Sequence, residues 1–385
     1  MEHGQRTWIS EADCRLEDFR RAVERHVRLV DYPLASAVHS NVLTYAGDDI
    51  RRAAADAESR KALMAEWARV MMDGPGILLF KNAFPDPAVV DAATDCFFAM
   101  IAEQRDGNAD AGDHFAKPGA NDRIWNALEK LCLRDPECFA RYYGNAVIAL
   151  VSEAWLGPGY QVTSQINVVN PGGEAQQPHR DYHMGFQTAD ILAQFPAHAH
   201  LLSPVLTLQG AVAHCDMPLE TGPTLYLPYS QTYEPGYLAW RKPEFIEYFG
   251  KHRIQLPLAK GDAVFFNPAL FHAAGSNRTQ DVKRMANLLQ ISSAYGRAME
   301  SVNRTRMSVA LYPALLDLRK AGRLSEQECA HAIAACAEGY SFPTNLDRDP
   351  PLYGLAPETQ AQLMLKAVVE AWAPEIFREA LAKQA

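Results

Sequence analysis

The chain has 385 residues, of which 48% are hydrophobic and 22% charged, values that exclude general disorder and allow a sizeable core. Its formal net charge is -9, with 46 acidic against 37 basic side chains and no basic run, so nucleic acid is not expected as a partner. Purely apolar stretches such as residues 146–151 are far shorter than the roughly 20 residues of a membrane span, so neither a membrane span nor a signal peptide is expected.

The first 73 residues are predicted to form a helical N-terminal flank. Ser10 fits an N-cap, and the segment after it has few helix breakers as far as Leu29. A second helix is expected from Asp48 to Met72, because Asp73-Gly74-Pro75-Gly76 would end it.

Residues 74–298 carry strand signals. Ile77–Phe80 is a short apolar run between turn residues, and Asp86-Pro87 would start a helix that reaches about Glu103. Further strand-like runs are Tyr160–Val169, Leu201–Ala213, Thr224–Leu227, Arg253–Leu258, Ala263–Phe266 and Met285–Ser292. Such a succession of short strands predicts a sandwich or barrel and argues against βαβ units.

Residues 299–385 are predicted to form a helical C-terminal extension. Ser325 and Glu328 fit a capping box, and a Pro- and Asp-rich loop is expected at 341–357. A last helix would follow, with an interruption at Pro374. The predicted fold class is therefore mainly β with helical flanks, in a single domain that covers the whole chain.

Two residues with period-two spacing, His179 and Asp181, are candidate metal ligands. On a strand both side chains would lie on one face, where an imidazole nitrogen and a carboxylate oxygen can bind one divalent metal. A His and an Asp at this spacing, without further ligands, usually mark an ordinary strand. A third ligand is therefore needed to support a metal site. His272, which follows the apolar run Ala263–Phe266, is the best candidate. Two His and one carboxylate form a facial triad that leaves three positions of octahedral Fe(II) open.

An arginine after His272 is the candidate anchor for an anion. Arg284 opens an apolar run, and a buried guanidinium needs an anionic partner because an unpaired buried charge is costly. A small carboxylate suits it, and near the metal that group would be the distal carboxylate of 2-oxoglutarate. The alternative is an internal Asp or Glu. Arg278 reads as an exposed turn residue.

These motifs together resemble a known family. His179-Arg180-Asp181, Gly222–Ser230 and Gly261–Arg284, in this order, are similar to the phytanoyl-CoA dioxygenase family, and Asp73–Phe80 is similar to its first strand. The resemblance covers about residues 73–295. It implies an Fe(II)- and 2-oxoglutarate-dependent oxygenase with a double-stranded β-helix core (jelly-roll, cupin-like), packed here by α-helices.

The resemblance also implies roles for individual residues. The residues that match the family's iron ligands are His179, Asp181 and His272. Arg284 matches the arginine that binds 2-oxoglutarate. Gln165 and Asn167 stand where the family often places polar contacts to this cosubstrate, and their alternative role is hydrogen bonding within the strand.

The chain departs from the family pattern at two points. The usual Pro-Gly-Ser-His turn reads Pro228-Tyr229-Ser230-Gln231 here, so this loop could line a different pocket. Arg284 follows His272 by twelve residues, one more than in some members, which keeps Arg278 as an alternative anchor.

Two further residues are candidate substrate contacts. His183 continues the alternation of His179 and Asp181, although a hydrogen-bonded core histidine fits equally well. Trp125 could shape the mouth of the site, with ordinary packing as the alternative.

The predicted activity is hydroxylation of an unactivated C–H bond of a small molecule with Fe(II), 2-oxoglutarate and O₂, releasing succinate and CO₂. Related halogenases lack the carboxylate that Asp181 supplies, so halogenation is not expected. Desaturation, ring closure and epimerisation use the same iron and stay open. A cupin-like metalloenzyme that does not use 2-oxoglutarate, or a non-catalytic binding or sensor protein on the same fold, also stays open.

The remaining expectations concern context. Seven cysteines without a CxxC pair indicate reduced thiols and a cytoplasmic location. The expected partner is a small-molecule substrate. Assembly into a homo-oligomer is compatible with the sequence.

Overall fold

Two β-sheets form the centre of this computed structural model, which describes residues 7–106, 119–341, 347, 350–351 and 354–384. The larger sheet has the strand order β1 (Ala37–His39), β2 (Val42–Ala46), β3 (Ile77–Lys81), β9 (Ala263–Phe266), β6 (Thr207–Ala213), β11 (Arg284–Ser292), β5 (Gln161–Val169) and β4 (Asn121–Ile124). The smaller sheet has the order β10 (Phe271–Ala273), β7 (Leu225–Leu227) and β8 (Ile254–Gln255). Strands β2 and β3 pair in parallel, and the other neighbours pair antiparallel.

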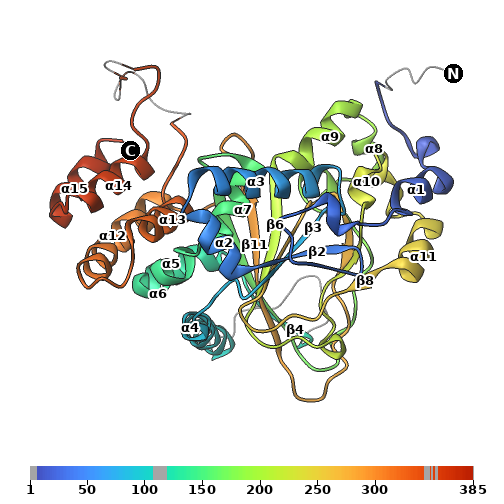
Figure 1. Cartoon of the computed structure of the whole chain (residues 1–385), viewed down its shortest axis with the longest axis horizontal. Coiled ribbons are helices and arrows are strands. Elements are labelled where there is room, and N and C mark those ends of the chain that lie inside the picture. The colour runs from blue at the N-terminus through green and yellow to red at the C-terminus, as the bar shows by residue number, and fades with distance from the viewer. Residues whose placement is uncertain (1–6, 107–118, 342–346, 348–349, 352–353, 385) are drawn as a thin grey trace.

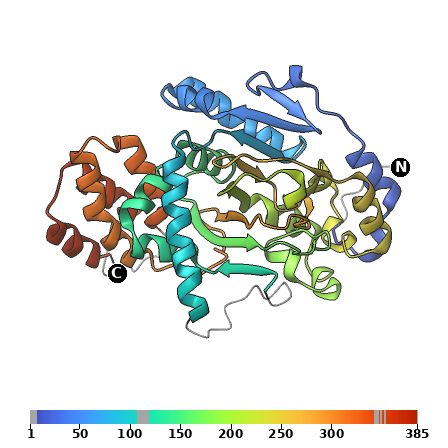
Figure 2. The same ribbon diagram turned by 90° about the horizontal axis from the view of Figure 1, so that it is seen from below.

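Helices cover the larger sheet and extend from both of its ends. Those before β5 are α1 (Leu16–Val23), α2 (Gly47–Ala54), α3 (Ala57–Met72), α4 (Pro87–Asp106), α5 (Ala127–Arg134), α6 (Pro136–Tyr143) and α7 (Ala146–Leu156). Those after it are α8 (Ala189–Leu192), α9 (Ala197–Val205), α10 (Gly236–Ala239), α11 (Pro243–His252), α12 (Arg304–Lys320), α13 (Glu326–Cys336), α14 (Gln360–Val369) and α15 (Pro374–Ala382). Helices α12 to α15 lie at the opposite end of the molecule from α1 and α11 (Figures 1 and 2).

The larger sheet separates a hydrophobic core from a cavity. Along β11, alternate residues from Met285 to Ile291 are buried, whereas Ala286, Leu288 and Gln290 between them are partly exposed and line a cavity. The buried face packs against helices, with α5 on β5 and α7 on β6. The sheet therefore presents one apolar face to the helices and one mixed face to the cavity.

Several predicted elements are confirmed. Strands lie within each of the predicted runs, although β8 is only two residues long. The capping box at Ser325 is present: the Ser325 Oγ accepts from the Glu328 N–H at 3.2 Å, and the Glu328 carboxylate accepts from the Ser325 N–H at 2.7 Å. The predicted interruption at Pro374 separates α14 from α15.

The N-terminal flank is not purely helical, which corrects the prediction. Strands β1 and β2 lie between α1 and α2, and β2 extends the larger sheet by pairing with β3. Leu43 and Tyr45 of β2 are buried in the main core. The segment Val42–Ala46 is short, and its membership of the sheet depends on a partner more than 30 residues away, which local periodicity does not report.

The middle of the chain is also more helical than predicted. Helices α5, α6 and α7 precede β5, and the predicted strand Leu201–Ala213 is helical up to Val205. Helix α7 is apolar nearly all round and buried, and periodicity cannot distinguish such a helix from a buried strand. Its start is set by Asn145, whose side chain accepts from the N–H groups of Val147 and Ile148. The fold is therefore mixed, with a β centre and extensive helical cover.

The predicted loop 341–357 lies mostly outside the described residues. Among the residues that the structure describes, no helix is both long enough and apolar enough to cross a membrane.

Candidate active site

A cavity of about 800 Å³ is lined by residues of both sheets. The larger sheet contributes Gln165, Gln209 and Arg284, and the smaller sheet contributes Tyr226 and His272. Most of the predicted site residues, which lie far apart in the sequence, therefore meet on the wall of one cavity.

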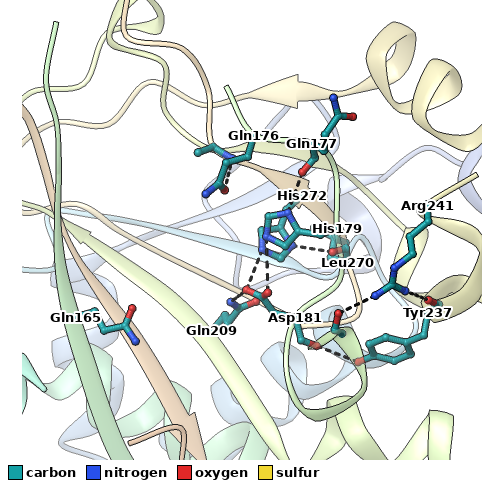
Figure 3. A network of polar contacts seen from close by, with 12 residues as sticks. Gln165, Gln176, Gln177, His179, Asp181, Gln209, Tyr237, Arg241, Leu270 and His272 are labelled. Atoms are coloured by element: carbon teal, nitrogen blue, oxygen red, sulfur yellow. Dashed lines mark hydrogen bonds and ion pairs between the residues drawn. The ribbon is translucent and has the colours of Figure 1, made fainter. Parts of the chain in front are cut away.

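The three predicted metal ligands converge at this wall. The Nε2 atom of His179 lies 3.7 Å from Oδ1 of Asp181, and Nε2 of His272 lies 3.4 Å from Oδ2 of Asp181. One ligand atom from each residue lies within 4.8 Å of the other two. Figure 3 shows both imidazole rings directed toward the carboxylate. Two imidazole nitrogens and a carboxylate oxygen at this separation fit a divalent transition metal such as Fe(II).

Backbone carbonyls fix which nitrogen of each histidine faces the carboxylate. Nδ1 of His179 lies 2.9 Å from the Gln177 carbonyl oxygen, and Nδ1 of His272 lies 2.9 Å from that of Leu270. Because a carbonyl oxygen only accepts, each Nδ1 carries the proton and each Nε2 offers its lone pair. Such a partner for the second nitrogen is typical of metal-binding histidines.

The backbone also holds the two histidines together. His179 N–H donates to His272 O at 2.9 Å, and His272 N–H donates to His179 O at 3.1 Å. The His179–Asp181 segment does not form the regular strand that its spacing predicted. His179 makes an isolated β-bridge, and the Asp181 N–H donates to Pro268 O at 3.1 Å. The segment is nevertheless held so that both side chains reach the same point.

The protonation states suit a cation. Burial alone would raise the pKa of Asp181, but His179, His272 and a hydrogen bond from Gln209 outweigh it and hold the pKa below its ordinary value. Burial lowers the pKa of His179. An ionised carboxylate and a neutral imidazole are the forms that bind a metal.

Arg284 lies at the start of β11 on the cavity wall and is 7% exposed. Its Nη1 makes long contacts with the carbonyl oxygens of Thr221 at 3.3 Å and Gly275 at 3.4 Å. No carboxylate of the described residues forms an ion pair with it, so the alternative of an internal acidic partner is not seen there. Burial lowers its pKa to about 10, which leaves the guanidinium charged at neutral pH.

Gln165 and Asn167 also line the cavity from β5. The Gln165 Oε1 accepts from Arg123 at 2.8 Å, and its Nε2 donates to Gln290 at 3.2 Å. The Oδ1 of Asn167 is buried without a partner among the described residues. Both side chains are therefore within the cavity wall, and their contacts to the cosubstrate remain a prediction.

The two candidate substrate contacts differ in position. Trp125 lines the cavity, with the Arg123 guanidinium 5.0 Å from the centre of its ring. His183 is not among the lining residues; its Nε2 lies 3.2 Å from the Arg297 carbonyl oxygen. The alternation ends because Tyr182 has a φ of 58° and a 3₁₀ turn follows it. Phe186, from that turn, lines the cavity instead.

The turn at residues 228–231 and the alternative anchor Arg278 lie outside the cavity wall. Gln231 donates to the Gly74 carbonyl oxygen at 2.8 Å, and the Tyr229 N–H donates to Pro75 O at 3.1 Å. This turn therefore supports the start of β3. Arg278 is exposed, as expected for a turn residue.

Sequence reasoning missed one polar contact to the triad and two residues that line the same cavity as Arg284. The Nε2 of Gln209 on β6 donates a hydrogen bond to Oδ2 of Asp181. Thr224 and Tyr226 line the cavity with Arg284. The Gly222–Ser230 motif was a signal for these two, whereas Gln209 lies inside a predicted strand without any motif.

Solved structures that are similar to this chain include three from nogalamycin biosynthesis. The non-heme alpha ketoglutarate dependent epimerase SnoN from nogalamycin biosynthesis has a TM-score of 0.42 and 20% identity, over 62% of this chain and 82% of that chain. Its complex with Fe3+, alpha ketoglutarate and nogalamycin RO gives 0.43 and 18%, over 64% and 88%. The carbocyclase SnoK from the same biosynthesis gives 0.42 and 18%, over 65% and 91%. No curated protein matches the sequence.

The family itself is identified by sequence. The pattern of the phytanoyl-CoA dioxygenase (PhyH) family matches residues 45–286, more than half of the chain. The predicted family is thereby confirmed, and with it iron and 2-oxoglutarate as cofactors, to which the His–Asp–His donor set is suited. The chain belongs to the phytanoyl-CoA dioxygenase family.

Proposed function

We propose that this protein is an Fe(II)- and 2-oxoglutarate-dependent dioxygenase that hydroxylates an unactivated C–H bond of a small molecule. The observation that carries the proposal is the combination of three converging ligand atoms and a buried guanidinium on one cavity wall. When bound, iron and 2-oxoglutarate supply the oxidising power through reaction with O₂, and succinate and CO₂ are released.

The protein residues bind and orient in this proposal. His179, Asp181 and His272 would hold iron, and the Nδ1 contacts would keep both Nε2 atoms available. Arg284 would bind the distal carboxylate of 2-oxoglutarate, because its charge has no carboxylate partner among the described residues. Gln165 and Asn167 would add polar contacts near it.

The architecture supports the family's fold. We propose that the two facing sets of strands are the double-stranded β-helix, with the iron site between them. The hydrophobic core that contains Trp67, Phe139 and Leu315 joins parts of the N-terminal flank, the middle and the C-terminal helices. This shared core supports a single catalytic domain.

Hydroxylation is favoured over halogenation because Asp181 is present and its carboxylate lies close to Nε2 of both imidazoles. Desaturation, ring closure and epimerisation remain alternative outcomes of the same chemistry. Mass analysis of the product separates them: hydroxylation adds one oxygen atom, desaturation and ring closure each remove two hydrogens, and epimerisation leaves the mass unchanged.

The cavity also limits the substrate. Its volume of about 800 Å³ falls in the range of roughly 300–1,000 Å³ that holds drug-sized ligands. Its wall carries apolar side chains, among them Leu288, Met299, Phe186 and Trp240. A small molecule with a largely apolar body fits this lining best.

The test is an anaerobic titration of the purified protein, first with Fe(II) and then with 2-oxoglutarate. We expect iron to bind and a weak visible charge-transfer band to appear when 2-oxoglutarate chelates it. Bound iron without a band would favour the cupin-like alternative. Absence of iron binding would favour a non-catalytic binding protein.

A further inference from the structure

Gln209 is a polar residue at the triad to which the family resemblance gave no role. It lies on β6, paired with Gln290 of β11 on one side and Phe266 of β9 on the other. Its side chain is 7% exposed, and its Nε2 donates to Oδ2 of Asp181 (Figure 3). An interior strand of an eight-stranded sheet is a rigid platform for such a contact.

The orientation of the Gln209 amide follows from chemistry. Both carboxylate oxygens of Asp181 only accept hydrogen bonds, so the amide nitrogen must face Asp181. The main chain of Asp181 is held separately, by its N–H bond to Pro268 at 3.1 Å and by the Tyr237 hydroxyl, which donates to the Asp181 carbonyl at 3.3 Å. The remaining freedom is rotation of the carboxylate, and the Gln209 contact limits that rotation.

Rotation matters because the two histidines approach different oxygens. Nε2 of His179 lies near Oδ1, and Nε2 of His272 lies near Oδ2 of Asp181. A carboxylate that offered both oxygens would use four of the six positions of an octahedral metal and leave two open. A carboxylate that offers one oxygen leaves three, which is the number needed for a bidentate cosubstrate and O₂.

We propose that Gln209 is a positioning residue that holds Oδ2 of Asp181, so that the carboxylate presents a single oxygen to the metal. This inference rests on the proposed function, because it assigns a metal to the His–Asp–His cluster. Its measurable consequence is metal affinity and ligand field, which are independent of turnover.

The test uses Co(II) as a spectroscopic substitute, titrated anaerobically into metal-free protein. Gln209→Met removes the donor at nearly constant length, and Gln209→Leu is the second variant if the first does not fold. Loss of a partner that orients a metal ligand typically costs about 10- to 100-fold in metal affinity, and we expect a loss in this range. The visible spectrum of bound Co(II) should change shape.

Gln290→Leu is the matched control. It is the cross-strand neighbour of Gln209 on the same cavity wall, and among the described residues its side chain contacts Gln165 at 3.2 Å and not the triad. Its Co(II) affinity and spectrum should equal those of the wild type. The thermal unfolding midpoint of each metal-free variant identifies a merely structural effect, which would lower the midpoint without changing the spectrum.

The outcomes are distinguishable. If the wild type binds Co(II) and Gln209→Met binds it with the same affinity and spectrum, the role of Gln209 is refuted while the proposed function stands. An equal loss of Co(II) affinity in Gln290→Leu would also refute this role, because any polar-to-apolar change on the cavity wall would then have the same effect. If the wild type does not bind Co(II), the metal site fails and the proposed function fails with it.

Discussion

Replacing Arg284 by Met tests whether Arg284 binds an anionic ligand or forms an ion pair that stabilises the fold. Arg284 is 7% exposed, and its hydrogen bonds to other described residues, two backbone carbonyls at 3.3 and 3.4 Å, are long. Most of its donors are therefore available to a ligand. Hydrogen bonds to charged groups contribute about 1.5–3 kcal/mol each, so two to a carboxylate contribute roughly 3–6 kcal/mol. This is about a 10²- to 10⁴-fold loss of 2-oxoglutarate affinity in the variant, since about 1.4 kcal/mol is tenfold.

In contrast to the large loss of 2-oxoglutarate affinity, the free energy of unfolding of Arg284→Met should change little. Breaking a buried ion pair by removing one partner typically costs about 3–5 kcal/mol. Because no described carboxylate pairs with Arg284, Arg284→Met should lower the free energy of unfolding of the metal-free protein by less than about 1 kcal/mol, or raise it. Removing an uncompensated buried charge offsets the loss of the two long contacts.

The assay is a 2-oxoglutarate titration of the Fe(II)-loaded protein, followed by its visible band, with urea unfolding of the metal-free protein alongside. Arg278→Met is the control, because Arg278 is an exposed arginine six residues before Arg284; it should change neither quantity. An unchanged 2-oxoglutarate affinity in Arg284→Met, or a loss of unfolding free energy near 3 kcal/mol, would refute the reasoning.

Three further predictions follow from the structure. The triad consists of His179, Asp181 and His272, and replacing any one of them by alanine should abolish turnover while the circular dichroism spectrum stays close to that of the wild type. Full activity in one of these variants would remove that residue from the triad. Burial lowers the pKa of His214 to about 3 from 6.5, so the unfolded chain binds its proton first and stability should fall as pH drops below about 6.5. Urea unfolding at several pH values should show a smaller fall in His214→Gln, and an identical fall would exclude this group. Trp67→Ala should cost about 3–5 kcal/mol, because the ring is fully buried against Tyr45 and Phe80, whereas Trp8→Ala at an exposed site should leave the unfolding midpoint nearly unchanged.

The metal site was predictable because its residues carry local signals. His179 and Asp181 are two positions apart, and Arg284 is a charge at the start of an apolar run, so each stands out without knowledge of the fold. His272 was the best candidate for the third ligand because it follows an apolar strand, but that signal is ordinary, and the family resemblance strengthened it. The structure adds the reason that these residues meet: β5, β6 and β11 are adjacent, and β10 brings His272 against His179.

The parts that could not be predicted depend on distant partners. Gln209 lies in mid-strand, and only the three-dimensional position of Asp181 gives it a role. Strand β2 needs β3 as a partner, and α7 is buried on nearly every side, so neither has a clear periodic pattern. At His183 the alternation begun by His179 and Asp181 ends, because positive φ angles at Tyr182 and His183 turn the chain.

The backbone hydrogen bonds that His179 and His272 exchange mean that a bound metal would link two segments that are already paired. The two segments already touch through both of their peptide groups, and a metal on both imidazoles would join the same pair a second time. A metal that binds only when the two segments are paired stabilises the paired state. The gain in free energy grows with the logarithm of the ratio of the metal concentration to its Kd. Opening of this bridge would separate two of the three metal ligands, so local unfolding of these segments would release the metal.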